Sequence, residues 1–286
     1  MRWKGGRQSD NFEDRRGMSS GGKLALGGVG GIIVLIVGLL LGGDPQQMLE
    51  QLQSTGTQTT EGPVEISAEE QELTELVKVV HASTEDVWQK VLRSEGLQFR
   101  PNTLVLYRDQ TPTDGCGMGA SAYGPFYCPA DEKVYIDLSF NDELHNRFGA
   151  TGEFAMAYVL AHEVGHHIQK LTGAMDKVNA ARQQLSEVQY NKVQVMLELQ
   201  ADFYAGVWAH HANKNSDVSL EYNDIRQGME AAAAVGDDRL QMQSQGHVVP
   251  EAFTHGTSEQ RAYWFKKGFD TGDMRQGDTF NDPSLQ

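Results

Sequence analysis

The chain has 286 residues, 39% of them hydrophobic, and a formal net charge of −15. This length and composition predict one globular domain with additional segments. An excess of negative charge on this scale makes the chain a poor candidate for binding nucleic acid or an anionic membrane surface, so we expect no nucleic-acid partner.

The N-terminal region divides into a polar leader and an apolar run. Residues 1–23 are polar and rich in glycine, and we expect them to be largely disordered. Residues 24–43 are uncharged and apolar, which is long enough to span the hydrocarbon core of a bilayer. A cleaved signal peptide is the rival interpretation, but both segments are long for one and no A-x-A cleavage motif follows. We therefore predict an uncleaved transmembrane helix at residues 24–43.

Charge predicts the orientation of this helix. Residues 1–43 carry six basic and three acidic side chains, a net charge of +3, which leaves −18 on the rest of the chain. Basic flanks tend to stay in the cytoplasm, so we expect a single-pass membrane protein. Its N-terminus would be cytoplasmic and its main domain extracytoplasmic. Residues 44–63, rich in Gln, Thr and Gly, are expected to form a flexible linker.

The domain after this linker, residues 64–270, is predicted to be mostly helical with a small sheet. Apolar spacing and capping residues predict helices that begin near residues 67, 83, 141, 152, 175, 220 and 258. Runs of β-branched and aromatic residues predict strands at 103–107 and 133–138. Residues 271–286 are expected to form a loose tail.

The only two cysteines, Cys116 and Cys128, lie in a Gly-rich stretch between the two predicted strands. A reduced pair, a metal-binding pair and a disulfide are the three possibilities. A disulfide fits best with the predicted extracytoplasmic, oxidising location. It would close a loop with eleven intervening residues and stabilise the fold by about 3 kcal/mol in the chain-entropy model.

The segment with the clearest chemistry is the H-E-x-x-H motif at residues 162–166. On a helix, His162 and His166 share one face and could bind one metal ion, and zinc favours nitrogen ligands of this kind. Glu163 follows the first histidine, where its carboxylate could act as the general base toward an attacking water. The alternative is a buried helix whose histidines are only hydrogen-bonded.

A second helical pair of acidic residues follows the motif. Glu198 and Asp202 are four residues apart, so both carboxylates point the same way. Glu198 is the candidate third zinc ligand, and Asp202 would accept the free ring N–H of a ligand histidine. The alternative is a solvated acidic helix face, against which the surrounding apolar residues argue.

His255, in the loop before the last predicted helix, is a candidate donor to the oxyanion that peptide hydrolysis creates. The other histidines fit this role less well. His81 and His145 precede the metal helix at expected cap or surface positions, and His210 and His211 lie too far along their helix from Glu198. A structural role for His255 at a loop–helix junction is the alternative.

Several segments together resemble the bacterial neutral zinc metallopeptidase family (YpfJ-like), a family of membrane-anchored proteases. The segments that carry the resemblance are residues 1–16, 162–169, 198–206 and 253–261. The metal motifs are also similar to those of the gluzincins. The resemblance runs nearly end to end and implies a zincin-like fold in which the 133–138 strand receives the substrate backbone as an added strand.

The resemblance also bears on His255. Membrane gluzincins carry a T-H-P segment followed by an arginine after the metal helices. Here Thr254 and His255 are followed by Arg261, although Gly256 stands where proline is usual. The similarity favours His255 as the oxyanion donor, and Arg261 is expected to brace the site by pairing with Asp202.

Residues and resemblance together predict a mostly helical α+β zincin-like metallopeptidase domain, with a small sheet packed on the metal helix and one transmembrane helix before it. It would be a zinc metalloendopeptidase with one Zn²⁺ per chain and a peptide or protein substrate. Two alternatives remain open, namely a zinc-binding envelope scaffold and a non-peptidase zinc amidohydrolase acting on a cell-wall peptide. A closed structural site usually has four ligands, so Glu163 beside the ligands counts against the scaffold.

Overall fold

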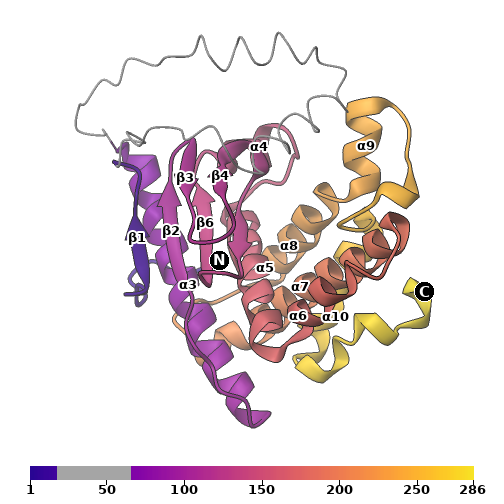
Figure 1. The fold of residues 1–286 in the computed structure, drawn as a ribbon. Helices are drawn as coiled ribbons and strands as arrows, with labels where there is room; N and C mark the ends of the chain where they lie inside the picture. Colours follow the sequence, from indigo (N-terminus) through magenta and orange to yellow (C-terminus); the bar gives the residue numbers. More distant parts are fainter. Residues whose placement is uncertain (18–65) are drawn as a thin grey trace.

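The computed structural model describes residues 1–17 and 66–286, and it shows an α+β fold in which a small sheet lies beside a larger group of helices (Figure 1). The helices are α3 (Ala68–Ser94), α4 (Phe140–Asn146), α5 (Glu153–Thr172), α6 (Ala174–Ala181), α7 (Glu187–Asn215), α8 (Tyr222–Ala234), α9 (Asp237–Gln245) and α10 (Ser258–Thr271). The strands are β1 (Phe12–Asp14), β2 (Thr103–Tyr107), β3 (Gln110–Pro112), β4 (Met118–Ala120), β5 (Phe126–Cys128) and β6 (Lys133–Asp137). This confirms the predicted mostly helical α+β class for the domain.

The main sheet has the strand order β1-β2-β6-β5. The first three strands are parallel, and β5 runs antiparallel to β6. Strand β6 therefore has a neighbour on each side, which corrects the expectation that this strand receives substrate along its length. Over Lys133–Tyr135 both of its main-chain edges are already paired, so the sheet edge next to the helices belongs to β5.

A separate hairpin of β3 and β4 lies next to this edge. As expected, Cys116 and Cys128 form a disulfide, which ties the turn of the hairpin to the end of β5. Gly119 on β4 packs directly against the ring of Phe126, because a Cβ at this glycine would come within 2.5 Å of that ring. The disulfide and this contact fix the position of the hairpin relative to β5.

The N-terminal residues differ from the prediction. Residues 1–17, part of the segment expected to be disordered, fold onto the domain and supply edge strand β1. Trp3 is 4% exposed and Arg16 is 6% exposed. The segment is polar in composition, but several of its charged side chains pair with carboxylates of α3. Composition alone does not reveal such pairing, so the order of the segment could not be predicted from it. The rest of that segment, the predicted transmembrane helix at 24–43 and the linker at 44–63 lie outside the described residues.

Several predicted helix boundaries also change. The two helices expected at 67 and 83 are one helix, α3, because Ser83 and Thr84 lie within it and are buried. The long helix expected from residue 175 is instead two helices, α6 and α7. Ser186 is the N-cap of α7 and forms a capping box that starts this second helix. The metal helix agrees closely with the prediction and becomes α5.

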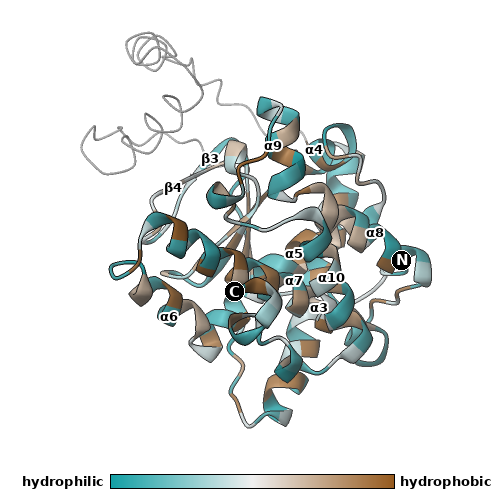
Figure 2. Ribbon diagram, turned by 90° about the vertical axis from the view of Figure 1, so that its right-hand side faces the viewer, coloured by the Kyte–Doolittle hydropathy of each residue, from teal (hydrophilic) through white to brown (hydrophobic). Residues whose placement is uncertain are grey.

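The core of the helical group lies where α5, α7 and α10 cross at short range. A Cβ at Gly165 of α5 would lie 2.9 Å from the Ala201 carbonyl oxygen of α7, and one at Gly206 of α7 would lie 2.0 Å from the Phe265 carbonyl oxygen of α10. Glycine at these two crossings lets the backbones approach. Helix α5 is buried from Phe154 to Gln169, whereas outer helices such as α9 are largely hydrophilic (Figure 2).

The C-terminal tail, expected to be loose, is packed against α7. It forms short 3₁₀ turns, and Thr279 within them is fully buried and donates to the Met196 carbonyl oxygen at 2.6 Å. Gln200 donates to the Gly277 carbonyl oxygen at 2.7 Å. Within residues 1–17 and 66–286, no helix has both the length and the apolar character needed to cross a bilayer.

Candidate metal centre

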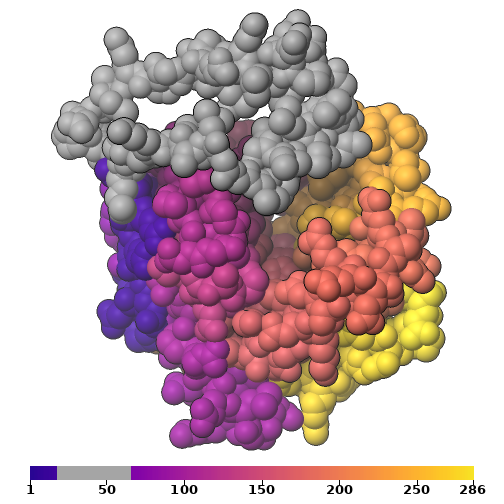
Figure 3. Space-filling view, in the orientation of Figure 1, coloured from indigo at the N-terminus to yellow at the C-terminus, as the bar shows by residue number. Residues whose placement is uncertain are grey.

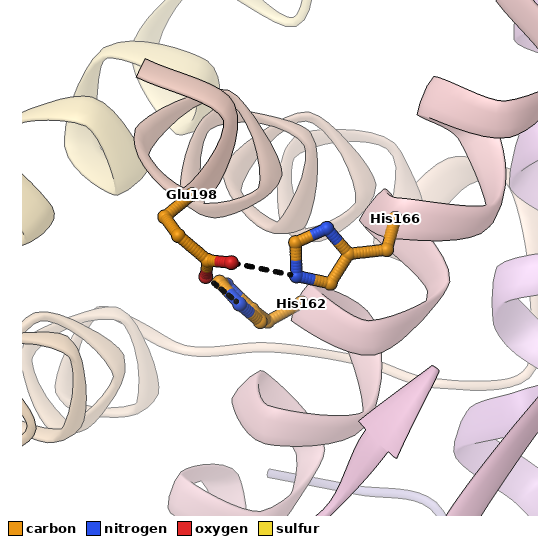
Figure 4. A group of neighbouring side chains, drawn as sticks. All are labelled: His162, His166 and Glu198. Carbon is orange, nitrogen blue, oxygen red and sulfur yellow. Dashed lines mark hydrogen bonds and ion pairs between the residues drawn. The ribbon is translucent and has the colours of Figure 1, made fainter. Parts of the chain in front are cut away.

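Helix α5 presents His162 and His166 one turn apart toward α7, and their Nε2 atoms converge on the carboxylate of Glu198 (Figure 4). His162 Nε2 lies 3.1 Å from Glu198 Oε2, and His166 Nε2 lies 3.5 Å from Oε1. One donor atom from each of the three residues lies within 4.8 Å of the other two. Among the described residues this is the one such group of three or more histidine, cysteine or acidic side chains.

The other ring nitrogen of each histidine is held by a separate acceptor. His162 Nδ1 donates to Asp202 Oδ1 at 2.7 Å, and His166 Nδ1 donates to Gln169 Oε1 at 2.8 Å. With a metal bound, these bonds would keep the ring proton on Nδ1 in both residues and direct the Nε2 lone pairs to the metal. Two imidazole nitrogens and one carboxylate oxygen are a donor set that suits zinc.

The acceptor for His166 was missed by sequence reasoning. Gln169 is buried and its amide donates to the Leu197 carbonyl oxygen and to Gln200 Oε1. Its side chain is therefore fixed in the orientation that accepts from the ring. The signal in the sequence is its position three residues after His166, one turn along the same face of the helix.

Asp202 is fully buried and accepts hydrogen bonds from several sides. As expected, Arg261 binds it, through Nε at 2.8 Å and Nη2 at 3.1 Å, and Tyr158 donates its hydroxyl as well. Burial opposes the negative charge, but Arg261 and His162 more than offset this and lower the pKa of Asp202 to about 2. Asp202 thus stays ionised beside His162. Tyr158, one turn before His162, was not predicted.

The carboxylate of Glu163 has no hydrogen-bond partner among the described residues, so it could act as a base. It is 8% exposed, and no hydrogen bond or ion pair of the described residues uses its carboxylate. Burial is the main influence on it and raises its pKa, against the lowering effect of His162 and His166. A carboxylate of raised pKa beside two metal ligands is suited to accept a proton.

The candidate oxyanion donor, His255, is held at the start of the last loop by Asp237. The Oδ2 atom of Asp237 accepts the backbone N–H groups of Thr254, His255 and Gly256 at 2.7, 2.6 and 3.1 Å. Its Oδ1 atom lies 3.2 Å from the ring Nδ1 of His255. Asp237 was missed, because its relation to His255 depends on a contact between α9 and a loop 18 residues away.

This loop packs near the metal ligands. Gly256 adopts φ +91°, and a Cβ there would lie 3.2 Å from the side chains of Val195 and Leu199, which flank Glu198 on α7. The side chain of His255 is 49% exposed, so its ring remains accessible. Burial opposes the charge of Glu198, but nearby histidines, His166 most strongly and His255 among them, hold its pKa well below the usual range.

The remaining histidines lie outside the centre. His167, next to the ligand His166, bonds to the Tyr127 hydroxyl and the Arg100 carbonyl oxygen. His81, expected at a cap or on the surface, is fully buried in α3, so that prediction was wrong. His145 is exposed, as expected. His210 bonds to the Phe269 carbonyl oxygen in the last turn of α10, and His211 bonds to the Gly272 carbonyl oxygen just after that helix.

The surface is hollowed between the strand region and the residues of α6 and early α7, and α5 lies behind this hollow in the same orientation (Figures 1 and 3). The candidate centre itself lies between α5 and α7, where His162 and His166 meet Glu198. Tyr127 of β5 contacts His167 of α5, so the β5 edge of the sheet is next to the ligand-bearing helix.

Comparison with known proteins agrees with this centre. The family model described as "Putative neutral zinc metallopeptidase" matches residues 1–280. The chain is 46% identical over 286 residues to the "Uncharacterized protein YpfJ" of Escherichia coli K12, covering 98% of this chain and 99% of the relative. It is 41% identical over 212 residues to the "Uncharacterized protein Rv2575" of Mycobacterium tuberculosis H37Rv, covering 71% of this chain and 69% of the relative. The search of solved structures gave no match. The chain belongs to the neutral zinc metallopeptidase family.

Proposed function

We propose that the protein is a zinc metalloendopeptidase that hydrolyses peptide bonds with one Zn²⁺ held by His162, His166 and Glu198. The observation that carries this proposal is the arrangement on one helix. The Nε2 atoms of both histidines face the Glu198 carboxylate, and Glu163 stands beside them with an unpaired carboxylate among the described residues. Zinc bound there would act as a Lewis acid that polarises the peptide carbonyl and makes water a better nucleophile.

The protein's own groups would supply the proton transfers and the orientation. Glu163 accepts the proton of the attacking water and passes it to the leaving amine. His255 donates a hydrogen bond to the carbonyl oxygen as negative charge develops on it, and Asp237 keeps the His255 loop in place. Arg261 acts less directly, because it neutralises the buried Asp202 that orients His162.

We further propose that the substrate is a peptide or protein whose backbone adds to the edge of the sheet at β5. In the main sheet β5 is the terminal strand on the side of α5, and its Tyr127 contacts the residue that follows His166. Main-chain pairing of this kind would supply affinity that depends little on side-chain identity. The disulfide between Cys116 and Cys128 would hold this edge rigid.

The donor set argues against the alternative of a structural zinc site. A closed structural site has four protein ligands, whereas three groups converge here among the described residues. Glu163 adds a largely buried carboxylate of raised pKa beside these groups, and such a carboxylate can serve as the base that hydrolysis requires. Both features favour an open, hydrolytic centre.

The disulfide also supports an oxidising compartment for residues 66–286. We propose that the protein acts at the bacterial inner membrane, held by the apolar run at 24–43, with the zinc centre on the periplasmic or extracytoplasmic side. Peptide substrates would then be met in the cell envelope.

The direct test is hydrolysis by the purified full-length chain. We expect the zinc-loaded protein to cleave a denatured protein or a mixed peptide library, to lose activity when a chelator removes the metal, and to regain it with stoichiometric zinc. A folded, zinc-loaded protein that cleaves only cell-wall peptide amides would support the amidohydrolase instead. One that cleaves neither substrate would support the scaffold.

A further inference from the structure

Residues 1–17 are bound to the rest of the domain through their backbone. Strand β1 pairs in parallel with β2, with Phe12 opposite Leu104 and Asp14 opposite Leu106. Two further bonds extend the ladder, from the Leu104 N–H to the Asn11 carbonyl oxygen at 3.0 Å and from the Arg15 N–H to the Leu106 carbonyl oxygen at 2.7 Å. The segment therefore supplies one edge of the sheet whose other edge, β5, contacts α5.

Side chains fix the segment at both ends. Trp3 is 4% exposed, and its indole N–H donates to Glu153, the first residue of α5, at 3.0 Å. Arg16 is 6% exposed and bridges Asp14 of β1 to Glu70 and Thr74 of α3. Burial of these two large side chains costs free energy unless their polar groups are paired, as they are here.

Four basic residues of the segment, Lys4, Arg7, Arg15 and Arg16, pair with carboxylates. Arg7 binds Glu85 at 3.1 Å and Asp86 at 2.9 Å. Ser9 and Asn11 both donate to the same Glu85 at 2.7 Å. Further pairs join Lys4 to Glu72, Arg15 to Glu13, Arg16 to Asp14, and Lys133 of β6 to Glu13.

This pairing gives a second explanation for the positive charge of the segment. The positive-inside rule concerns basic residues that stay in the cytoplasm beside a membrane span. Here Lys4, Arg7 and Arg16 make ion pairs with carboxylates of α3, so their positive charge contributes to the binding of the segment to the domain.

We propose that residues 1–17 and residues 66–286 form one folded unit on the same side of the membrane, in place of the single crossing between them that the sequence predicts. A hydrogen-bonded ladder requires its two strands in the same compartment, whereas one crossing would put about 30 Å of hydrocarbon between them. An apolar run of twenty residues suffices for one crossing and not for two. The first 17 residues are therefore extracytoplasmic if the zinc centre is.

Topology can be tested with two variants of the full-length protein, each of which adds one free cysteine to the disulfide-bonded pair Cys116 and Cys128. Asp10 is exposed in the N-terminal segment and Tyr222 is 88% exposed in the domain. A membrane-impermeant maleimide would be applied to spheroplasts and to detergent lysates of cells that carry Asp10→Cys or Tyr222→Cys, with a cytoplasmic thiol protein as control. For each variant, labelling in spheroplasts would be divided by labelling in the lysate, and we expect this ratio to be the same for both variants. Labelling of Tyr222→Cys in intact spheroplasts with Asp10→Cys labelled only after lysis would overturn the proposal.

Binding of the segment to the domain needs a second measurement, because two separate parts could share a compartment without touching. Hydrogen exchange of the purified full-length chain should show peptides covering β1 protected to a degree similar to those covering β2. In Arg16→Glu, the β1 peptides should lose protection, while Arg16→Lys should keep most of it. Exchange of the wild-type β1 peptides at the rate of an unstructured chain would also overturn the proposal. Neither measurement uses hydrolysis, so failure here is separate from failure of the proposed function.

Discussion

The two sides of helix α5 use buried histidines in different ways, although the residues concerned are neighbours in the sequence. On the side facing α7, His166 donates through Nδ1 to Gln169 and turns Nε2 toward Glu198. On the side facing the sheet, His167 uses both ring nitrogens, one with the Tyr127 hydroxyl and one with the Arg100 carbonyl oxygen. A histidine is available to a metal only when one nitrogen is held by an acceptor and the other remains free.

The same difference appears in the supporting residues. His162 and His166 each have one acceptor, Asp202 or Gln169, that is itself bound on other sides by buried groups. The partners of His167 complete its hydrogen bonding and tie α5 to β5 and to the chain before β2. One side of α5 is thus built to present ligands, and the other to hold the helix on the sheet.

Adjacent substitutions should separate the two sides most strongly. We expect His166→Ala to lose zinc, because only two of the three donors remain, and His167→Ala to retain it at one equivalent. Metal analysis of the purified variants after equilibration with limiting zinc would check this. Glu198→Ala should behave like His166→Ala, and stoichiometric zinc in that variant would point to a different third ligand.

The next largest effect concerns His255, whose loop packs against α7 beside Glu198. If His255 stabilises the oxyanion, His255→Ala should lower kcat by roughly 10²–10³-fold with zinc content unchanged. Asp237→Asn, which keeps the size of the side chain that holds the loop, should produce a smaller loss in the same direction. Full turnover by folded, zinc-loaded His255→Ala would leave His255 with a structural role only.

Arg261→Ala should affect both stability and metal binding. Removal of the guanidinium leaves Asp202 buried beside His162 without its main counter-charge, which should cost about 3–5 kcal/mol of folding free energy. Zinc affinity should fall by roughly 10–100-fold, because Asp202 orients a ligand. Denaturant unfolding and a competitive zinc titration would measure the two effects. A variant with wild-type values for both would show that Arg261 does not brace the centre.

The smallest effect is expected on the sheet-facing side. His167→Phe should destabilise the fold by about 1–3 kcal/mol, because it leaves the Tyr127 hydroxyl and the Arg100 carbonyl oxygen without their partner. Zinc affinity should not change. Tyr127→Phe, which removes only the hydroxyl, is the matched control and should cost less. A loss of zinc in His167→Phe equal to that in His166→Ala would remove the distinction between the two sides.

Much of the centre could be predicted because its parts are local. His162, Glu163 and His166 lie within five residues on one helix, and Glu198 and Asp202 within five on another, so helical spacing alone aligns each set. Gln169, Tyr158 and Asp237 escaped prediction because amide, hydroxyl and carboxyl side chains are common. Only the packing of separate elements shows which of them reach a histidine.

For the fold as well, elements with a local sequence pattern could be predicted, and contacts between distant parts of the chain could not. Apolar spacing located α5 and α10 closely, and β-branched runs located β2 and β6. The order of residues 1–17 was not predicted, because β1 has three residues and its partner lies about 90 positions later. The pairing of Arg16 with Glu70, and of Arg7 with Glu85, likewise depends on contacts between distant parts of the chain.

Glu163→Gln tests the central claim most directly, because it changes one oxygen of the carboxylate to an amide and leaves all three proposed ligands in place. Zinc content, thermal unfolding and peptide hydrolysis would be measured on the same preparation of wild type and variant. We expect one equivalent of zinc and a wild-type unfolding profile, with hydrolysis reduced to no more than a few per cent. Retention of more activity than this in the folded, zinc-loaded variant would contradict the assignment of Glu163 as the base.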